Sequence, residues 1–263
     1  MNKSVVSRRL VLSSVLAAAS LAGFALPVTL SAQSKALHKT PDGKPDFTGF
    51  FHWPEAKNGM HGKGSATVFD RKYFAPFKPG GEAFLEPRTG DPRHDEPRDF
   101  CMPAGFPGGF LSAYPVQMFQ TKDYVVMMNE FQRITRVVPL DGRPHRTGLE
   151  PTYYGDPVGH WEGNTLVVDT TGFKRWNLDD YFYTDPKEFR MHSDAFHTVE
   201  RLTWRDDNTV DYQITIDDPK IFTRPWSQDF EMTLRPDWEK QGLLEYECEE
   251  NNRCTGGHCE GNK

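Results

Sequence analysis

Titratable side chains gather most densely between residues 191 and 201, where the sequence reads Met-His-Ser-Asp-Ala-Phe-His-Thr-Val-Glu-Arg. An imidazole and a carboxylate that face one cavity can exchange protons with a bound molecule, because the ordinary pKa of histidine lies near neutral pH. We therefore predict acid/base catalysis by residues of this run, namely His192, Asp194, His197 and Glu200.

The same run fits a metal site as an alternative, since two histidines and one carboxylate form a common catalytic metal shell. The predicted ligands of a divalent metal are then His192, His197 and Glu200. On an extended strand His197 and Glu200 point to opposite faces, so both reach one ion only if the strand begins late or bends. The leading hypothesis requires no cofactor. In a purely structural alternative, Asp194 turns the chain and Glu200 forms a surface ion pair.

A second cluster, 153–163, reads Tyr-Tyr-Gly-Asp-Pro-Val-Gly-His-Trp-Glu-Gly. Gly159 beside His160 indicates a close approach of the backbone on a strand. We expect His160 to be catalytic and to converge with His192 and His197 in one cavity. The structural alternative is that this segment supplies only a core tryptophan and a hairpin turn.

Substrate binding is predicted for aromatic residues and one arginine around that cavity: Tyr153, Trp161, Tyr181, Arg224 and Trp226. Arg224 lies in a Pro-bounded loop with two aspartates, and its planar guanidinium matches a carboxylate on a substrate. The alternative is that Arg224 ties the loop to Asp217 or Asp218.

β-Strands have to position these residues. After Pro115 the apolar residues recur with a period of two, which predicts strands separated by tight turns such as Glu-Gly-Asn at 162–164. The predicted runs are 116–120, 124–131, 133–139, 158–162, 165–171, 196–205, 209–217, 226–234 and 243–249. Strands joined by short hairpins form an antiparallel meander, so we predict a mostly-β fold closing into a lipocalin-like barrel. A β-sandwich is the alternative.

The alternation also predicts the faces of two strands. The inward residues should be Val210, Tyr212, Ile214 and Ile216 in one strand, and Trp226, Gln228, Phe230, Met232 and Leu234 in the other. The stretch 180–194 interrupts the meander and is predicted to form a lid or a short helix over one end of the barrel.

The beginning of the chain predicts export. Lys3, Arg8 and Arg9 precede an apolar run, and the small residues around Ala32 form a cleavage site, as in a signal peptide. The arginine pair resembles a twin-arginine signal. We expect residues 1–32 to be removed and the mature protein to be periplasmic or secreted. A retained anchor helix is the alternative.

The mature chain is predicted to have three parts. Residues 33–115 are crowded with Gly, Pro and aromatic residues, which indicates an irregular wrap packed on a core. Residues 116–250 should form the barrel domain, and 251–263 a tail rich in Cys and Gly.

Four cysteines, Cys101, Cys248, Cys254 and Cys259, lie after the predicted cleavage site. An oxidising compartment favours disulfides. We expect Cys101 to pair with Cys248, and Cys254 with Cys259, because the last two lie in a Gly-rich tail that can close a small loop. A metal clip that also uses His258 is the alternative and would need free thiolates.

The net charge of -6 and the lack of a Lys/Arg block argue against a nucleic-acid partner. The expected partner is a small-molecule ligand or substrate, with no stable membrane insertion after signal cleavage. The sequence contains no Gly-x-Ser-x-Gly elbow, phosphate loop, dinucleotide fingerprint or His-Glu-x-x-His motif. Serine esterase, kinase, Rossmann oxidoreductase and zincin activities are therefore disfavoured.

Several segments together resemble a large, uncharacterised family of exported bacterial proteins. They are 40–46 with Gly49, Val-Gly-His-Trp-Glu-Gly-Asn-Thr-Leu-Val-Val-Asp-Thr at 158–170, His-Ser-Asp-Ala-Phe-His-Thr-Val-Glu-Arg at 192–201, 216–219 with 223–226, and 244–248. The resemblance spans most of the mature chain and implies that these segments belong to one module. It implies no activity. The tail after Asn252 is an addition to the usual pattern.

These features lead to a functional hypothesis: an exported enzyme that performs acid/base chemistry of lyase, isomerase, cyclase or hydratase type on a small apolar or aromatic molecule in the barrel. The alternatives are a non-catalytic carrier of such ligands and a metal-dependent hydrolase. The leading hypothesis requires the rings of His160, His192 and His197 to turn inward toward a shared chamber.

Overall fold

The computed structural model describes residues 38–53, 69, 71–87, 89–91, 101–112, 114–178 and 188–246, together with 254–255 and 258–259. For 188, 189, 254, 255, 258 and 259 the description covers the backbone only. The helices in these ranges are short 3-10 segments: η1 (Arg71–Tyr73), η2 (Gly81–Phe84), η4 (Phe131–Arg133) and η5 (Pro236–Lys240). Across the same ranges, no helix has the length and hydropathy needed to cross a membrane.

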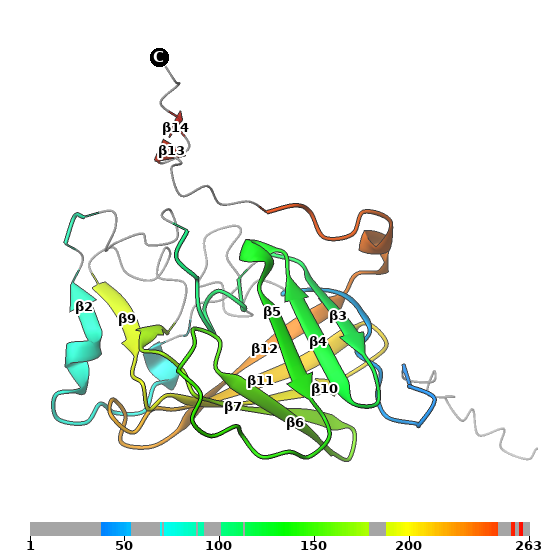
Figure 1. Cartoon of the computed structure of the whole chain (residues 1–263), viewed down its shortest axis with the longest axis horizontal. Coiled ribbons are helices and arrows are strands. Elements are labelled where there is room, and N and C mark those ends of the chain that lie inside the picture. The colour runs from blue at the N-terminus through cyan, green and yellow to red at the C-terminus, as the bar shows by residue number, and fades with distance from the viewer. Residues whose placement is uncertain are drawn as a thin grey trace, which may run out of the picture. The chain divides into compact units, whose positions relative to one another are not determined.

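Nine strands form the main sheet: β1 (Gly49–His52), β3 (Val116–Gln120), β4 (Tyr124–Asn129), β5 (Thr135–Pro139), β6 (Asp156–Glu162), β7 (Thr165–Thr171), β10 (His197–Trp204), β11 (Thr209–Asp217) and β12 (Trp226–Leu234). All hydrogen-bonded neighbours are antiparallel, in the order β5-β4-β3-β1-β12-β11-β10-β7-β6. The sheet curls into a nearly closed barrel (Figure 1). The predicted mostly-β, lipocalin-like barrel is confirmed.

The strands follow one another around the barrel in chain order, and β12 returns to pair with β1. Short turns make this possible. β6 and β7 are joined by Gly163 and Asn164 alone, and Gly163 has a φ of 60°, the left-handed conformation that a two-residue hairpin turn requires. Turn residues such as Gly163 and Asn164 therefore favour antiparallel pairing of strands that follow one another in the chain.

The ring has a seam between β5 and β6, which are the two ends of the hydrogen-bonded order. With nine strands and antiparallel neighbours throughout, the first and last strands point the same way, whereas an antiparallel ring closes only with an even number. Each seam strand contains a proline, Pro139 or Pro157, which removes a backbone donor. The seam is therefore closed by side chains.

Gly159 on β6 is part of that closure. A Cβ at this position would lie 2.7 Å from Cδ2 of Leu140 and 2.8 Å from Cγ1 of Val138, so the end of β5 packs directly on the β6 backbone. The predicted close approach at Gly159 is thus confirmed, and its partner is the other seam strand.

Because β5 and β6 run in the same direction, the connection between them must travel back along the barrel. This crossing segment, 140–155, is tied to the barrel wall by Arg146, which donates from its backbone N and its Nε to Asp156, each at 2.8 Å. It also pairs in a parallel bridge between Thr152 and Phe173. Because the number of strands is odd, the crossing segment passes over the outer face of β6 and β7.

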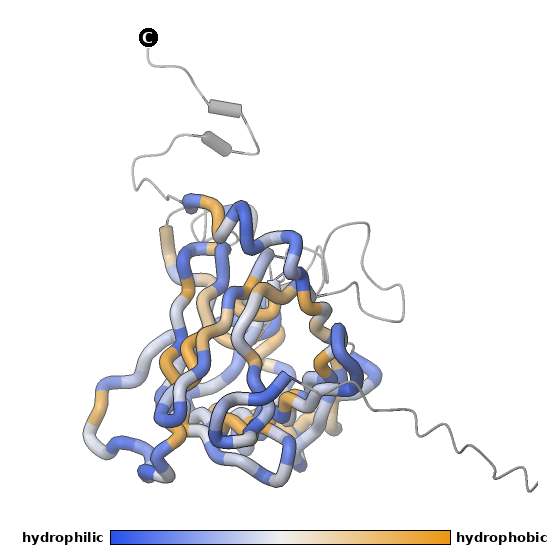
Figure 2. Tube along the Cα trace, turned by 90° about the vertical axis from the view of Figure 1, so that its right-hand side faces the viewer, coloured by the Kyte–Doolittle hydropathy of each residue, from blue (hydrophilic) through white to orange (hydrophobic). Residues whose placement is uncertain are grey.

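Alternate residues of the strands fill the interior. Val210, Tyr212, Ile214 and Ile216 are at most 1 % exposed, as their alternation predicted. Trp226, Gln228, Phe230 and Met232 are buried too. Figure 2 shows hydrophilic segments at many of the outer loops of the trace and hydrophobic segments between them.

Two smaller sheets lie outside the barrel order. One consists of β2 (Leu85–Pro87), β9 (Glu188–His192) and β8 (Trp176–Asn177), in the order β2-β9-β8. The other is the pair β13 (Cys254–Thr255) and β14 (His258–Cys259).

Three expectations about elements need correction. Residues 33–115 were expected to be irregular throughout, yet β1 is a full barrel strand between β3 and β12. Residues 188–192 of the expected lid form strand β9, and residues 180–187 of that lid lie outside the described residues. Residues 243–246 of the last expected strand are not a strand.

Candidate functional site

Glu200 lies inside the barrel, where it forms an ion pair with Arg136. The two side chains come from β10 and β5 and are at most 1 % exposed. Arg136 donates from Nη1 to Oε2 at 2.9 Å and from Nη2 to Oε1 at 2.5 Å, and the Tyr212 hydroxyl donates to Oε2 at 2.9 Å. The carboxylate is thus fully engaged by charge-assisted hydrogen bonds, which are the strong ones.

Aromatic rings enclose the guanidinium of Arg136. Its Cζ lies 4.0 Å from the ring centroid of Phe106 and 5.0 Å from that of Phe110. Burial disfavours the charged form, but the charge and hydrogen bonds of Glu200 outweigh it and raise the pKa of Arg136. Burial, helped by Glu200, raises the pKa of Tyr212 well above its usual value. Both groups keep their protons, so Glu200 does not act as a free base.

The ion pair also crosses the seam. Arg136 on β5 reaches Glu200 on β10 and donates from Nη2 to the Oγ1 of Thr170 on β7 at 3.3 Å. Backbone hydrogen bonds do not link β5 to the strands beyond the seam. The side chain of Arg136 therefore connects the two ends of the sheet from within.

His192 is fully buried at the end of β9. Its ring stacks on Phe196 with centroids 4.2 Å apart and meets Phe173 edge-on at 5.8 Å. Nδ1 lies 3.0 Å from the carbonyl oxygen of Ser193, which only accepts, so Nδ1 carries the hydrogen and Nε2 the lone pair. Burial lowers the pKa of His192 to about 4, and the ring is neutral at neutral pH.

Asp194 lies on the surface. It is 61 % exposed and forms an ion pair with Lys220, whose hydrogen bond lowers the pKa of the carboxyl. The neighbouring Ser193 instead points inward and donates from N and Oγ to Asp218, each at 2.7 Å. Asp194 thus sits in the turn that leads into β10, as the structural alternative predicted.

His197 lies on the outer face of the barrel, because it is out of phase with the inward residues of β10. Its Nε2 lies 3.0 Å from Oδ1 of Asp169, and the Nε2 of His145 in the crossing segment lies 2.8 Å from the same atom. Nδ1 of His145 is 3.6 Å from Asp156. We call these four groups the histidine–aspartate chain. Since a carboxylate only accepts, both Nε2 atoms carry hydrogens in these contacts.

Asp156 anchors this chain. Burial alone would raise its pKa, but the hydrogen bonds from the backbone and guanidinium of Arg146 outweigh burial and hold the pKa below its usual value. The Asp156 carboxylate is therefore ionised at neutral pH and faces Nδ1 of His145 at 3.6 Å.

The three histidines that were expected to converge are separate. His192 is buried in aromatic packing, His197 is on the outer face, and His160 is 53 % exposed with its Nε2 3.3 Å from Glu162. The expectation of a shared inward chamber is wrong, because the period of two in β6 and β10 sends His160 and His197 outward.

Two predicted substrate-binding aromatics have structural partners. Tyr153 packs edge-on against Trp176 with centroids 4.8 Å apart. Trp161 stacks on Phe47 at 6.2 Å and is partly buried against the core. Tyr153 and Trp161 therefore contact different parts of the structure and do not line one common cavity.

The remaining substrate-binding predictions are also dispersed. Trp226 is 3 % exposed and packs among core aromatics. Arg224 is exposed and donates to the carbonyl oxygen of Pro225 at 3.2 Å. Tyr181 lies outside the described residues.

The predicted metal ligands do not form one coordination shell. Glu200 is engaged by Arg136, His197 by Asp169, and His192 by Ser193. Within the described part of the chain, no group of three or more His, Cys, Asp or Glu side chains is placed to hold a metal ion.

The predicted disulfides remain predictions. Cys248 lies outside the described residues, while Cys254 faces Cys259 in the register of β13 and β14. The described residues include no free cysteine.

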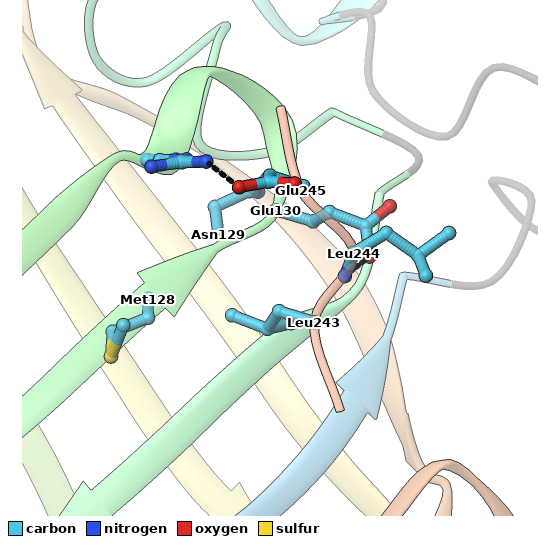
Figure 3. Close-up of a pocket in the computed structure, with 7 residues that line it drawn as sticks. Met128, Asn129, Glu130, Leu243, Leu244 and Glu245 are labelled. Carbon is cyan, nitrogen blue, oxygen red and sulfur yellow. Dashed lines mark hydrogen bonds and ion pairs between the residues drawn. The ribbon is translucent and has the colours of Figure 1, made fainter. Parts of the chain in front are cut away.

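A pocket of about 380 Å³ lies between β4 and the segment 241–246, which we call the C-terminal strap. Figure 3 shows the side chains of Met128 and Leu243 on either side of it. The pocket is lined by Met128, Asn129, Glu130, Arg133, Leu243, Leu244 and Glu245. Apolar side chains thus form its body and charged ones its edge.

Specific contacts hold the strap over the pocket. Leu244 donates its backbone N–H to Oε2 of Glu130 at 2.7 Å, and Arg133 lies 3.4 Å from Glu245. Tyr246 meets Phe131 edge-on at 5.3 Å. Arg133 has a φ of 50°, a conformation that non-glycine residues rarely adopt and that is often found near functional sites.

Sequence reasoning missed Arg136, His145 and Asp169 as partners of the predicted site residues. Arg136 could have been found, since it alternates with Thr135 and Val137 and so shares the inward face of Ile134 and Val138. No local pattern indicates His145, because only the crossing segment brings it to Asp169.

Loss of one partner of the buried ion pair should cost more than loss of both. Glu200→Leu or Arg136→Met leaves an unpaired buried charge and should lower the free energy of unfolding by about 3–5 kcal/mol. The double variant should cost less than either single variant, since no buried charge remains. Urea denaturation of the purified protein measures these values, and additive costs would show that the two groups are not coupled.

His192 should make stability fall as the pH falls. Its pKa is about 4 in the folded chain against 6.5 ordinarily, so the unfolded chain binds the proton more readily. The free energy of unfolding should be full above about pH 6.5 and decrease toward pH 4, by up to about 3 kcal/mol. His192→Phe should lack this decrease, and His160→Gln should retain it. Parallel pH profiles for His192→Phe and the unmodified chain would contradict the assignment.

Comparison of the chain with protein-family models, with curated proteins and with solved structures finds no match. The resemblance to a family of exported bacterial proteins stays a prediction. Function has to be inferred from the geometry of this chain's own side chains.

Proposed function

We propose that this protein is an exported binding protein for a small, largely apolar organic molecule, which it holds in the pocket under the C-terminal strap. The observation that supports this proposal is the pocket between Met128 and Leu243. It corresponds to the carrier alternative of the sequence analysis.

Size and lining both favour a small organic ligand. Ligand pockets commonly measure about 300–1,000 Å³ and combine an apolar body with a few polar groups. The pocket of about 380 Å³ falls at the small end of that range, and Met128 and Leu243 provide the apolar body. A ligand with one aromatic ring and a short chain fits such a volume.

The barrel provides a rigid wall for the pocket, and the strap provides a movable one. Met128 belongs to β4, which pairs on both sides with β3 and β5. The strap contacts the turn after β4 at Glu130, Arg133 and Phe131. Local opening of these contacts would give a ligand a route into the pocket.

Filling the pocket should abolish binding. The neutral fluorescent probe N-phenyl-1-naphthylamine should bind the mature chain saturably, and Leu243→Trp should weaken binding at least about tenfold because the indole occupies the ligand volume. Val137→Trp is the matched control, since Val137 is 49 % exposed on β5 and does not line the pocket. Fluorescence titration measures the affinity. Binding that survives Leu243→Trp would contradict the proposal.

Acid/base catalysis at the histidine–aspartate chain is the second candidate function. Asp169 orients the ring of His197 and would stabilise an imidazolium, which leaves Nδ1 as a base on a ring that is 32 % exposed. This arrangement supports the acid/base hypothesis at His197 on the outer face, with Asp169 and His145 as positioning residues.

Proton exchange tests this candidate without a known substrate. Mature protein in D2O should accelerate deuterium uptake at the acidic C–H of small aromatic ketones, as followed by NMR, and His197→Gln should remove at least about 99 % of the acceleration. His160→Gln should leave it unchanged, because His160 is another exposed histidine beside a carboxylate. Equal rates with the unmodified chain and His197→Gln would exclude this activity at His197.

A further inference from the structure

The charged residues at the edge of the pocket are unequal in sign. The lining of the pocket contains two carboxylates, Glu130 and Glu245, and one guanidinium, Arg133. Arg133 and Glu245 lie 3.4 Å apart and largely offset each other, with both side chains exposed. One negative charge, that of Glu130, is left over.

Glu130 is held in a fixed position without a cation. Its Oε2 accepts the backbone N–H of Leu244 at 2.7 Å, which ties the carboxylate to the strap. Within the described residues no Lys, Arg or His lies in ion-pair distance of Glu130, although many other surface carboxylates of the chain have such a partner. An oriented carboxylate beside an apolar pocket is a counter-charge for a ligand cation.

We propose that the pocket takes a cationic amphiphile, an ammonium group on a short apolar or aromatic body, with the ammonium against Glu130 and the body between Met128 and Leu243. This inference rests on the proposed binding function and adds the class of ligand. The ammonium would donate to the oxygen of Glu130 that does not bind Leu244, so binding leaves the strap contact in place.

Three ligands that differ only in the end group test the charge. Phenylbutylamine, phenylbutanol and phenylbutanoate share one apolar body and are cationic, neutral and anionic at neutral pH. Isothermal titration calorimetry with the mature chain should show the amine binding roughly tenfold more tightly than the alcohol, and the carboxylate most weakly. Added salt should reduce the difference between the amine and the alcohol, because exposed charges are screened.

Substitutions then locate the charge. Glu130→Gln should reduce amine affinity to that of the alcohol and leave alcohol affinity unchanged, since the amide oxygen can still accept from Leu244. Arg133→Gln should increase amine affinity, because it removes the opposing charge. Glu150→Gln makes the same charge change outside the pocket lining and should alter neither affinity.

The outcomes separate the two proposals. Equal affinities for amine and alcohol, or an amine preference that survives Glu130→Gln, would overturn the cationic ligand while the pocket stands as a binding site. Absence of saturable binding for all three ligands would overturn the binding function, and the choice of ligand with it.

Discussion

The ion pair between Arg136 and Glu200 is the interaction on which the barrel depends. β5 and β6 meet while running the same way, and they are the two ends of the hydrogen-bonded strand order. Arg136 spans this gap from within by binding Glu200 on β10 and Thr170 on β7. Removing one member of a buried pair costs about 3–5 kcal/mol, a large part of the roughly 5–15 kcal/mol that stabilises a typical protein. Glu200, which the sequence analysis predicted as a catalytic carboxylate, is thus part of the ion pair that closes the barrel.

The same seam explains why polar chemistry lies on the outside. A connection between parallel neighbours must return along the barrel, and the crossing segment does so over β6 and β7. It brings His145 against Asp169, beside His197. The buried side chains are, in contrast, mainly aromatic and aliphatic, and the polar ones among them include the ion pair of Arg136 with Glu200 and the neutral ring of His192. Titratable groups that could exchange protons with a ligand therefore gather on the outer wall.

The pocket has a different origin, in the turn from β4 to β5. Residues 132 and 133 both have positive φ, and the turn directs Glu130 and Arg133 toward the C-terminal strap. Gln132 stabilises this turn by accepting from the backbone N of Ala104 at 2.6 Å and donating to the carbonyl oxygen of Met102 at 3.0 Å. The pocket and the barrel closure thus use opposite faces of two neighbouring strands, with Met128 on the outer face of β4 and Arg136 on the inner face of β5.

The strands and turns that depend on short-range sequence patterns could be predicted from the sequence alone. A period of two, with turn residues between the runs, was enough to predict eight barrel strands, their chain order and the buried faces of β11 and β12, because alternation and turn preference act over a few residues. It did not predict β1, whose four residues have no such pattern of their own, nor the position of the imidazoles. Which of His197 and Glu200 is buried depends on which face of β10 is covered. Whether Arg136 meets Glu200 depends on how the two ends of the nine-stranded sheet come together. Tertiary structure decided these contacts, because each joins residues that are distant in sequence and are brought together only by closure of the barrel.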